Sequence, residues 1–327
     1  MKLVLGTMTF GKQVDEDTAS RMLEAYAKTG FKELDTAFIY NEGKTESMLG
    51  ELLGKRLSKA TGQDNHNKPT LLSMAGKADP GGHPDRLSAS GINAQLETSL
   101  SRTGRKHFDL YYLHSPDLDT PIEDSLAAIN QAHQSGKITN FGLSNYAAWQ
   151  VAQICEICKK EGWLSPVCYQ GMYNAITRDV EKELFPCLKD YGLAFYVYNP
   201  LAGGLLTGKY LRSTELPTNG RFSYHKGYPE RYWKDSNMQG VSLVADACHK
   251  ENIAVASAAL RWLIHHSPLN EWQAGMEHAV VLGASTIEQL QENLAACVEG
   301  PLPTIITDQF EQAWKKAEPF CIKYFRP

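Results

Sequence analysis

Residues 31–53, FKELDTAFIYNEGKTESMLGELL, form the stretch from which the fold of this chain can be predicted. The first part holds an apolar run, and residues 32–36 are expected to form a short buried strand with Asp35 at its end. The second part predicts a helix over residues 45–57, because apolar side chains recur there at helical spacing. Thr45 is the expected N-cap of that helix.

Asp35 and Tyr40 are polar groups in this stretch that packing alone does not explain. In barrels of parallel strands, catalytic side chains lie at the carboxyl ends of strands and in the loops that follow them. Asp35 at a strand end and Tyr40 in the next loop fit that position. The alternative is structural: Asp35 caps a turn, and the tyrosine is a half-buried packing residue.

The alternation of strand and helix continues along the whole chain. The predicted strands cover residues 3–5, 32–36, 71–76, 108–113, 138–143, 166–169, 193–197 and 279–282. The predicted helices cover residues 15–29, 45–57, a segment through Ile92, Leu96 and Leu100, and then 122–134, 147–160, 180–188, 239–250, 257–265 and 287–297. A polar segment at 60–68 and a segment rich in Gly, Tyr and Arg at 200–236 show no strong period.

Eight strand–helix units with short connections predict a parallel sheet closed on itself. The expected fold class is α/β, a (β/α)8 TIM barrel in which residues 1–327 form one domain. Long loops and the C-terminal tail are expected over the mouth of the barrel, at the carboxyl ends of the strands.

Composition excludes several classes of protein. Of the 327 residues, 43% are hydrophobic and 21% are charged, which is ordinary for a globular protein, and the formal net charge of -4 predicts no nucleic-acid partner. No apolar run approaches the roughly 18 residues of a membrane helix, so no membrane contact is expected. The start of the chain does not resemble a signal peptide, and seven scattered cysteines indicate reduced thiols. We therefore expect a cytoplasmic protein.

The unusual polar residues of the chain fall at one kind of position. Eight of them lie at or just after the carboxyl end of a predicted strand: Asp35, Lys77, His114, Ser144, Asn145, Gln170, Tyr198 and Ser285. In a barrel these ends all point to the same mouth. The pattern therefore predicts a site there.

Four residues, Asp35, Tyr40, Lys77 and His114, could together protonate a carbonyl oxygen. A tyrosine phenol has a pKa near 10, and a nearby lysine ammonium favours the phenolate and lowers that pKa. The carboxylate holds the lysine charged, and a neutral imidazole can hydrogen-bond the same substrate oxygen. This set predicts a general acid, and no metal is needed.

The later strand ends could hold a hydride donor. Asn145 and Gln170 carry amides suited to a nicotinamide carboxamide, and Tyr198 offers a ring face for stacking. Gly203, Gly204 and Gly208 would let the backbone approach a pyrophosphate closely.

Motifs along nearly the whole chain resemble those of one family, the aldo-keto reductases. They are LDTAFIY (34–40) with Lys77, YLHSPD (112–117), GLSNYAAWQ (142–150), YQGMYNAITR (169–178), YNPLAGGLLTGKY (198–210) and LGASTIEQLQENL (282–294). In detail the chain is similar to the subfamily of aflatoxin aldehyde reductases, which also reduce succinic semialdehyde. The resemblance implies reduction of an aldehyde by NADPH, small-molecule aldehydes as partners, and a homodimer.

The resemblance also implies roles for individual residues. Asp35, Tyr40, Lys77 and His114 take the positions of the catalytic tetrad, with Tyr40 as the acid. NADP(H) positions fall on Ser144, Asn145, Gln170, Tyr198, Asn199, Pro200, Leu201, Ala202, Gly203, Gly204, Lys209, Arg221, Ser285, Gln289, Glu292 and Asn293. Substrate positions fall on His114, Tyr228, Arg231 and Arg326. Residues 284–294 contain no Lys or Arg, which relatives often place beside the 2′-phosphate, so Lys209 and Arg221 are the expected phosphate contacts.

Other motifs in the chain suggest different roles, and one other class of function fits the same residues. Residues 203–209 spell GxxxxGK, but Tyr210 stands where a nucleotide-binding P-loop has Ser or Thr. Cys155 and Cys158 form a CxxC within a helix, where packing is the expected role, and His265 and His266 at a helix end fit a favourable interaction with the helix dipole. The alternative function is a regulatory subunit that binds a nicotinamide cofactor with little turnover.

Overall fold

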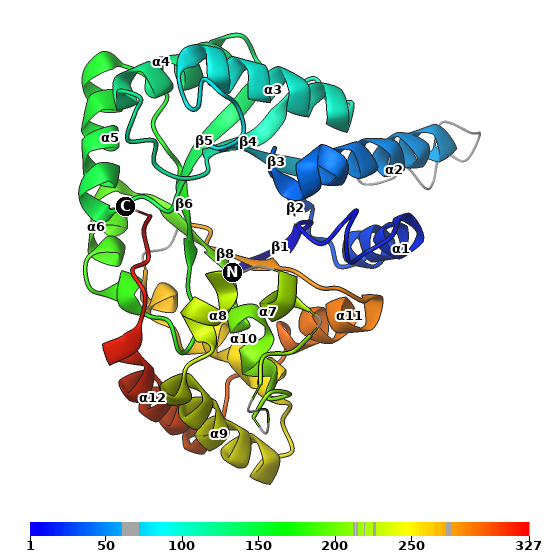
Figure 1. Cartoon of the computed structure of the whole chain (residues 1–327), viewed down its shortest axis with the longest axis vertical. Coiled ribbons are helices and arrows are strands. Elements are labelled where there is room, and N and C mark those ends of the chain that lie inside the picture. The colour runs from blue at the N-terminus through cyan, green and yellow to red at the C-terminus, as the bar shows by residue number, and fades with distance from the viewer. Residues whose placement is uncertain are drawn as a thin grey trace.

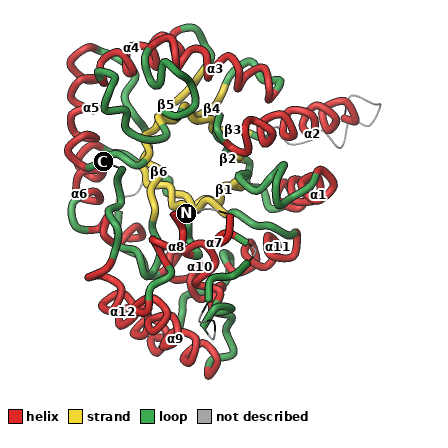
Figure 2. Tube along the Cα trace, viewed as in Figure 1, coloured by secondary structure: helices red, strands yellow, loops and turns green. Residues whose placement is uncertain are grey.

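The computed structural model describes residues 1–60, 72–211, 213, 215–218, 220–224, 227–272 and 276–326. All eight strands are parallel and close into a barrel in chain order, as the sequence predicts, and helices surround the ring of strands (Figures 1 and 2). The strands are β1 (Lys2–Gly6), β2 (Glu33–Asp35), β3 (Ser73–Ala78), β4 (Phe108–Leu113), β5 (Ile138–Ser144), β6 (Cys168–Met172), β7 (Ala194–Tyr198) and β8 (Ala279–Leu282).

The helices follow the strands as crossover connections or cover the ends of the barrel (Figure 1). They are α1 (Glu16–Ala27), α2 (Lys44–Ala60), α3 (Ala89–Thr103), α4 (Ile122–Gln134), α5 (Ala148–Glu161), α6 (Leu184–Tyr191), α7 (Arg221–Tyr224), α8 (Gly227–Tyr232), α9 (Asp235–Lys250), α10 (Val255–His265), α11 (Ile287–Ala296) and α12 (Thr304–Ala317). No helix in these described ranges is long and apolar enough to cross a membrane.

The side chains of each strand alternate between two apolar layers. One set packs against the helices, and the other fills the barrel with Val4, Ala75, Leu110, Tyr112, Cys168, Tyr196, Ala279 and Val281. Paired residues share a face, and Asp35 pairs with Ala75, Lys77 with Tyr112, and Gln170 with Tyr196. Strand geometry therefore turns Asp35, Lys77 and Gln170 into the barrel interior.

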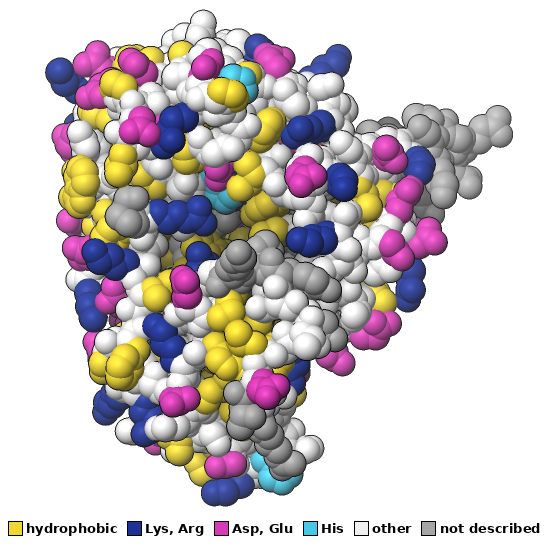
Figure 3. Space-filling model, viewed as in Figure 1, with side chains coloured by type: hydrophobic (Ala, Val, Ile, Leu, Met, Phe, Trp, Pro, Cys, Tyr) yellow, Lys and Arg dark blue, Asp and Glu magenta, His cyan; other side chains and the backbone are white. Residues whose placement is uncertain are grey.

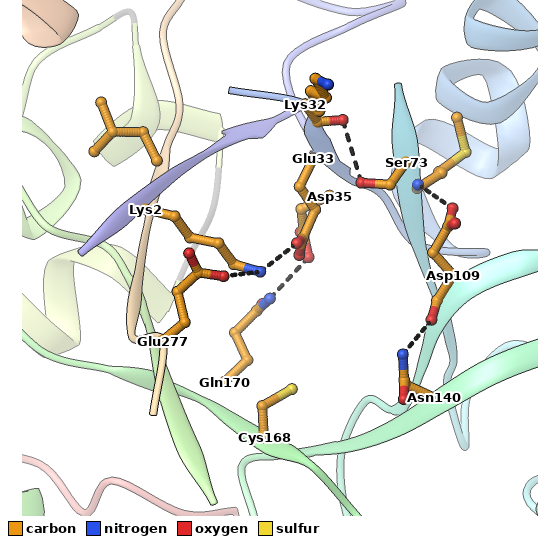
Figure 4. A network of polar contacts seen from close by, with 12 residues as sticks. Lys2, Lys32, Glu33, Asp35, Ser73, Asp109, Asn140, Cys168, Gln170 and Glu277 are labelled. Atoms are coloured by element: carbon orange, nitrogen blue, oxygen red, sulfur yellow. Dashed lines mark hydrogen bonds and ion pairs between the residues drawn. The ribbon is translucent and has the colours of Figure 1, made fainter. Parts of the chain in front are cut away.

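An ion pair closes the amino end of the barrel interior. Nζ of Lys2 lies 2.7 Å from Oε2 of Glu33, 3.7 Å from Oε2 of Glu277, and 4.8 Å from the centre of the Tyr196 ring (Figure 4). The interior is thus apolar in the middle, with charged groups at both ends.

Thr45 is not the N-cap of α2, contrary to the prediction. The chain enters this helix from a 3-10 turn, η1 (Tyr40–Gly43), so α2 begins at Lys44 and Thr45 lies inside its first turn. The Thr45 hydroxyl donates to the carbonyl of Phe10 at 2.8 Å. It ties α2 to the loop after β1.

Strands β3 and β6 end two and three residues later than predicted. β3 runs to Ala78, so Lys77 lies within it, and β6 is displaced to Cys168–Met172, so Gln170 lies at its centre. The predictions ended these strands just before Lys77 and Gln170. The backbone ladder continues past a polar side chain, however, when the barrel interior gives that side chain a partner.

Three further predictions on helices need correction. The helix predicted at 180–188 begins at Leu184, which leaves Pro186 in the first turn, where its missing N–H is tolerated. The segment 200–236 contains α7 and α8, and helix α12 was not predicted, although Ile306, Phe310 and Trp314 are buried at helical spacing. The segment predicted as a loop at 60–68 lies, beyond Ala60, outside the described residues.

Gly50 sets the distance between α2 and α3, which leads to a prediction. A Cβ at Gly50 would lie 2.2 Å from the carbonyl oxygen of Arg102, whereas a Cβ at Gly54, one turn later, meets nothing within 4 Å. Gly50→Ala should lower the free energy of unfolding by about 1–3 kcal/mol through overpacking. Gly54→Ala, the matched control, should raise it by up to about 1 kcal/mol through helix propensity. Denaturant unfolding followed by circular dichroism measures both, and equal changes would contradict this packing.

Candidate active site

A cavity of about 800 Å³ opens at the carboxyl ends of the strands. In the space-filling view this face is hollowed at its centre, and Lys or Arg side chains lie beside the hollow (Figure 3). The predicted site residues that line the cavity are Asp35, Tyr40, His114, Ser144, Asn145, Gln170, Tyr198, Asn199, Pro200, Leu201, Gly203, Gly204, Lys209, Arg221, Tyr228, Arg231, Ser285, Gln289, Glu292, Asn293 and Arg326. Lys77 and Ala202 do not line it, because both side chains are fully buried behind its wall.

Asp35 and Lys77 form a buried ion pair in the floor of the site. Nζ of Lys77 lies 2.5 Å from Oδ2 of Asp35 and donates to the carbonyl of Thr36 at 2.9 Å. The amide of Gln170 reaches across the barrel and donates to the same Oδ2 at 2.7 Å (Figure 4). Burial lowers the pKa of Lys77, while Asp35 opposes that shift by favouring the ammonium.

Tyr40 stands on a turn with a strained backbone. The next two residues, Asn41 and Glu42, have φ values of 49° and 59°, in the left-handed region. The Asn41 amide donates to the carbonyls of Met8 and Phe10 at 3.0 and 2.9 Å, which fastens the turn to the loop after β1. These bonds hold the Tyr40 ring at the cavity.

Tyr40 lies close to the other predicted catalytic groups. Its ring centre is 5.6 Å from Nζ of Lys77 and 6.0 Å from the His114 ring centre. The pKa of the Tyr40 phenol is raised well above its ordinary value, first by burial and then by the Asp35 carboxylate. The positive charge of Arg221 lowers this pKa, but burial and Asp35 outweigh it, so the phenol keeps its proton at neutral pH.

His114 is buried at the same wall. Burial lowers the pKa of its imidazole, and the positive charges of Lys77 and Arg326 lower it further, while the Asp79 carboxylate raises it. The imidazole is therefore neutral near pH 7, which is the form that the sequence analysis expects. Nδ1 of His114 lies 3.0 Å from Oδ2 of Asp79, at an angle short of a well-aligned hydrogen bond.

The amide of Asn145 is engaged within the protein. Asn145 has a φ of 65°, its Oδ1 accepts from the Tyr198 hydroxyl at 2.7 Å, and its Nδ2 donates to the carbonyl of His114 at 2.8 Å and to Oγ of Ser144 at 3.0 Å. Asn145 thus fixes Tyr198 and the loop after β5. Its expected contact with a carboxamide would have to share these bonds.

The loop after β7 presents backbone to the cavity. Gly203 and Gly204 have φ values of 68° and 100° and line the cavity, as the predicted approach to a pyrophosphate requires. A Cβ on Gly203 would lie 2.5 Å from Cδ1 of Tyr228, so no larger residue fits there. Gly208 closes the 3-10 turn η3 (Ala202–Thr207) and is not among the lining residues, contrary to the expectation.

Two arginines pack against the ring of Tyr228, and a third lies in the C-terminal tail. The guanidinium groups of Arg221 and Arg231 each lie 5.4 Å from the Tyr228 ring centre, and the Tyr228 hydroxyl donates to Oδ1 of Asn199 at 2.8 Å. The backbone N–H of Arg326 donates to the carbonyl of Asn145 at 2.9 Å, which brings the C-terminal tail to the mouth. Cation–π packing and a position on the cavity wall are therefore both observed for Arg221 and Arg231.

The start of α11 forms another part of the wall. Thr286 is the N-cap of this helix, and Gln289 accepts from the backbone N–H and the hydroxyl of Ser285 at 3.1 and 2.9 Å. A helix N-terminus favours an anion through its oriented N–H groups.

Sequence reasoning missed one whole edge of the cavity. The cavity is lined there by Gly6 at the end of β1, by Thr7, Met8 and Thr9 after it, and by Gln13, Asn41, Thr207, Ala254 and Ala256. The first of these were detectable, because they directly follow a predicted strand, as the other site residues do. Their side chains are small or uncharged, so the residue types alone did not indicate a functional site.

The cysteine and histidine motifs have structural roles. Cys155 and Cys158 are buried in α5, and burial raises the pKa of their thiols to about 12 and about 11, which makes them poor nucleophiles. His265 and His266 contact the chain at Glu299 and Leu302. Within the described ranges, no group of three or more His, Cys, Asp or Glu could hold a metal ion.

Comparison with known proteins gives the class and then the family. A model of the Aldo/keto reductase family matches residues 2–315. The chain is 47% identical over 335 residues to Aldo-keto reductase family 7 member A3 of Homo sapiens, covering 99% of this chain and 96% of that protein. It is 46% identical over 333 residues to Aflatoxin B1 aldehyde reductase member 2 of Homo sapiens, with 99% and 89% covered. The barrel is thus that of an oxidoreductase that works with a nicotinamide cofactor. The chain belongs to the aldo/keto reductase family.

Proposed function

We propose that this protein reduces aldehydes to alcohols with NADPH and that Tyr40 is the general acid. One observation carries the proposal: Tyr40 and His114 line the same cavity as Arg221, Arg231 and Arg326, above the buried pair of Asp35 and Lys77. A reacting carbonyl and two anionic groups thus have complementary partners within one cavity.

The residues present fit a nicotinamide dinucleotide. Gly203 and Gly204 bring backbone without side chains to the cavity wall, and Lys209 and Arg221 supply cations on the same wall. Gln170 and Tyr198 lie in or at the end of their strands near the catalytic groups. When bound, the reduced cofactor supplies the hydride for the carbonyl carbon.

The chain's own groups handle the proton. Tyr40 holds its phenolic proton at neutral pH and donates it to the carbonyl oxygen as negative charge develops there. The ammonium of Lys77 then stabilises the phenolate that remains, and Asp35 keeps Lys77 charged. His114 lies on the adjacent wall of the same cavity.

The substrate class follows from the arginines. Arg231 and Arg326 reach the cavity from α8 and the C-terminal tail, both outside the barrel strands. A carboxylate held by a guanidinium in a confined site would orient the aldehyde carbon beneath Tyr40. We propose an aldehyde with an anionic far end, of which succinic semialdehyde is the simplest case.

The decisive experiment is a panel of aldehydes assayed with NADPH and NADH by loss of nicotinamide absorbance. Rapid multiple turnover supports the enzyme. Firm nucleotide binding with little turnover on every aldehyde would instead favour the regulatory subunit. A cytoplasmic location and a homodimer remain predictions, and fractionation and light scattering would test them.

Tyr40→Phe should abolish most of the activity. The substitution removes the proton and keeps the ring, so kcat should fall about 10²–10⁴-fold, the usual contribution of general acid catalysis. NADPH affinity, measured by fluorescence titration, should change little. A variant with near-normal turnover would remove Tyr40 from this role.

Arg221→Ala should weaken the binding of NADPH far more than that of NADH. A guanidinium can bind the 2′-phosphate through two parallel hydrogen bonds, and losing such a charge-assisted pair costs about 10- to 100-fold in affinity. Titration of both cofactors measures the effect, with Lys209→Ala as the comparison. Equal affinities of the unmodified protein for the two cofactors would contradict the NADPH preference.

Arg231→Ala and Arg326→Ala should each raise KM for succinic semialdehyde about 10- to 100-fold, from the same range of energies. KM for 4-nitrobenzaldehyde, which lacks the carboxylate, should change much less. Arg231→Lys keeps the positive charge, so its KM for succinic semialdehyde should lie between those of the unmodified protein and Arg231→Ala. Equal losses on both substrates would mean that the arginines support the fold or the cofactor.

A further inference from the structure

Asp79 is a buried carboxylate beside the site for which the mechanism above has no use. It follows β3 directly, its surface is 7% exposed, and its Oδ2 lies 3.0 Å from Nδ1 of His114. The backbone N–H of His114 donates to the carbonyl of Ala78 at 2.8 Å, which brings the ends of β3 and β4 together. A small rotation of the imidazole, whose χ2 torsion is soft, aligns Nδ1 with the carboxylate.

Three hydrogen bonds hold Asp79 in place. Its Oδ1 accepts from the backbone N–H of Gly81 at 2.8 Å. The buried amide of Gln95, on α3, accepts from the backbone N–H of Asp79 at 2.9 Å and donates to its carbonyl at 3.1 Å. Gly82 makes room for that amide, because a Cβ there would lie 2.4 Å from Oε1 of Gln95. With Oδ1 committed to Gly81, Oδ2 is the oxygen that faces His114.

We propose that Asp79 is a positioning residue that holds the proton of His114 on Nδ1 and thereby decides what Nε2 can do in the reaction. This inference rests on the proposed aldehyde reduction. Nδ1 is buried against Asp79, so Nε2 is the nitrogen left for the cavity. In the neutral ring with Nδ1–H, Nε2 is an acceptor and cannot donate to a carbonyl oxygen. It donates only when the ring takes up a second proton, and it can accept the hydroxyl of an alcohol when the ring is neutral.

This arrangement makes reduction sensitive to pH. The groups that face the imidazole are Lys77 from β3, Asp79 directly after it, Tyr40 from η1 and Arg326 from the tail. Burial and the two cations keep the pKa of His114 below its ordinary value, so the second proton binds only in acid. As the pH falls through that pKa, Nε2 gains a proton and kcat/KM for aldehyde reduction should rise about 10-fold or more, the contribution of one charge-assisted hydrogen bond.

Asp79→Asn tests the inference with almost no change in shape. The Asn oxygen stays on the N–H of Gly81, so its NH₂ group falls where Oδ2 was and donates to Nδ1. This forces the proton of the neutral ring onto Nε2, so that His114 donates at any pH. In the ¹⁵N spectrum of full-length histidine-labelled protein, the His114 signal, assigned with His114→Gln, should change from the Nδ1–H to the Nε2–H tautomer. The acid rise in kcat/KM should disappear in the same variant.

The controls separate this role from a structural one. Asp79→Ala also breaks the bond to Gly81. A loss of stability in Asp79→Ala that is absent in Asp79→Asn therefore measures the structural role of this turn alone. An Nε2–H tautomer in the unmodified protein, an unchanged tautomer in Asp79→Asn, or an acid rise that persists there would overturn the inference. The tautomer is read without turnover, so a protein that reduces no aldehyde would refute the proposed function while the spectrum still tests the pair.

Discussion

The rest of the site depends on one ion pair, between Lys77 and Asp35 inside the barrel. Their side chains are 0% and 5% exposed, and burying two charges costs several kcal/mol per ion unless each keeps partners. The carbonyl of Thr36 and the amide of Gln170 supply those partners. The interior must therefore be apolar below this layer and open above it, and the site can form only at that height of the barrel.

Three asparagines turn the loops around this layer into a rigid frame. Asn41, Asn145 and Asn199 all have positive φ, which asparagine tolerates better than most residues. The side chain of each bonds a neighbouring loop or ring: the carbonyl of Met8 for Asn41, that of His114 for Asn145, and the Tyr228 hydroxyl for Asn199. Backbone strain at a site persists only where the surroundings fix it in this way.

The barrel could be predicted from sequence because strand and helix patterns are local. Once the strands are known, the alternation of side chains along them accounts for the inward direction of Asp35, Lys77 and Gln170. Sequence alone did not predict that Thr45 bonds Phe10, nor that Asp79 faces His114, because these contacts join segments far apart in the chain. Asp79 stands in ADPGG, a composition typical of a turn. The expected lowering of the Tyr40 pKa was wrong for a related reason: burial, which sequence does not show, and the Asp35 carboxylate raise this pKa well above its ordinary value.

The charge of the cavity differs from that of the chain, and this difference links the fold to its ligands. The whole chain has a formal net charge of -4, yet the described lining carries the cations Lys209, Arg221, Arg231 and Arg326 against the carboxylates Asp35 and Glu292. Asp35 is already neutralised by Lys77, so the mouth is positive. A concave site of one sign focuses its field and raises the local concentration of anions. The catalytic groups come mainly from the strands and the turns next to them, whereas these cations come from the later segment that holds α7 and α8 and from the tail. Loop changes can therefore alter which anionic molecule is held without disturbing the proton chemistry beneath it.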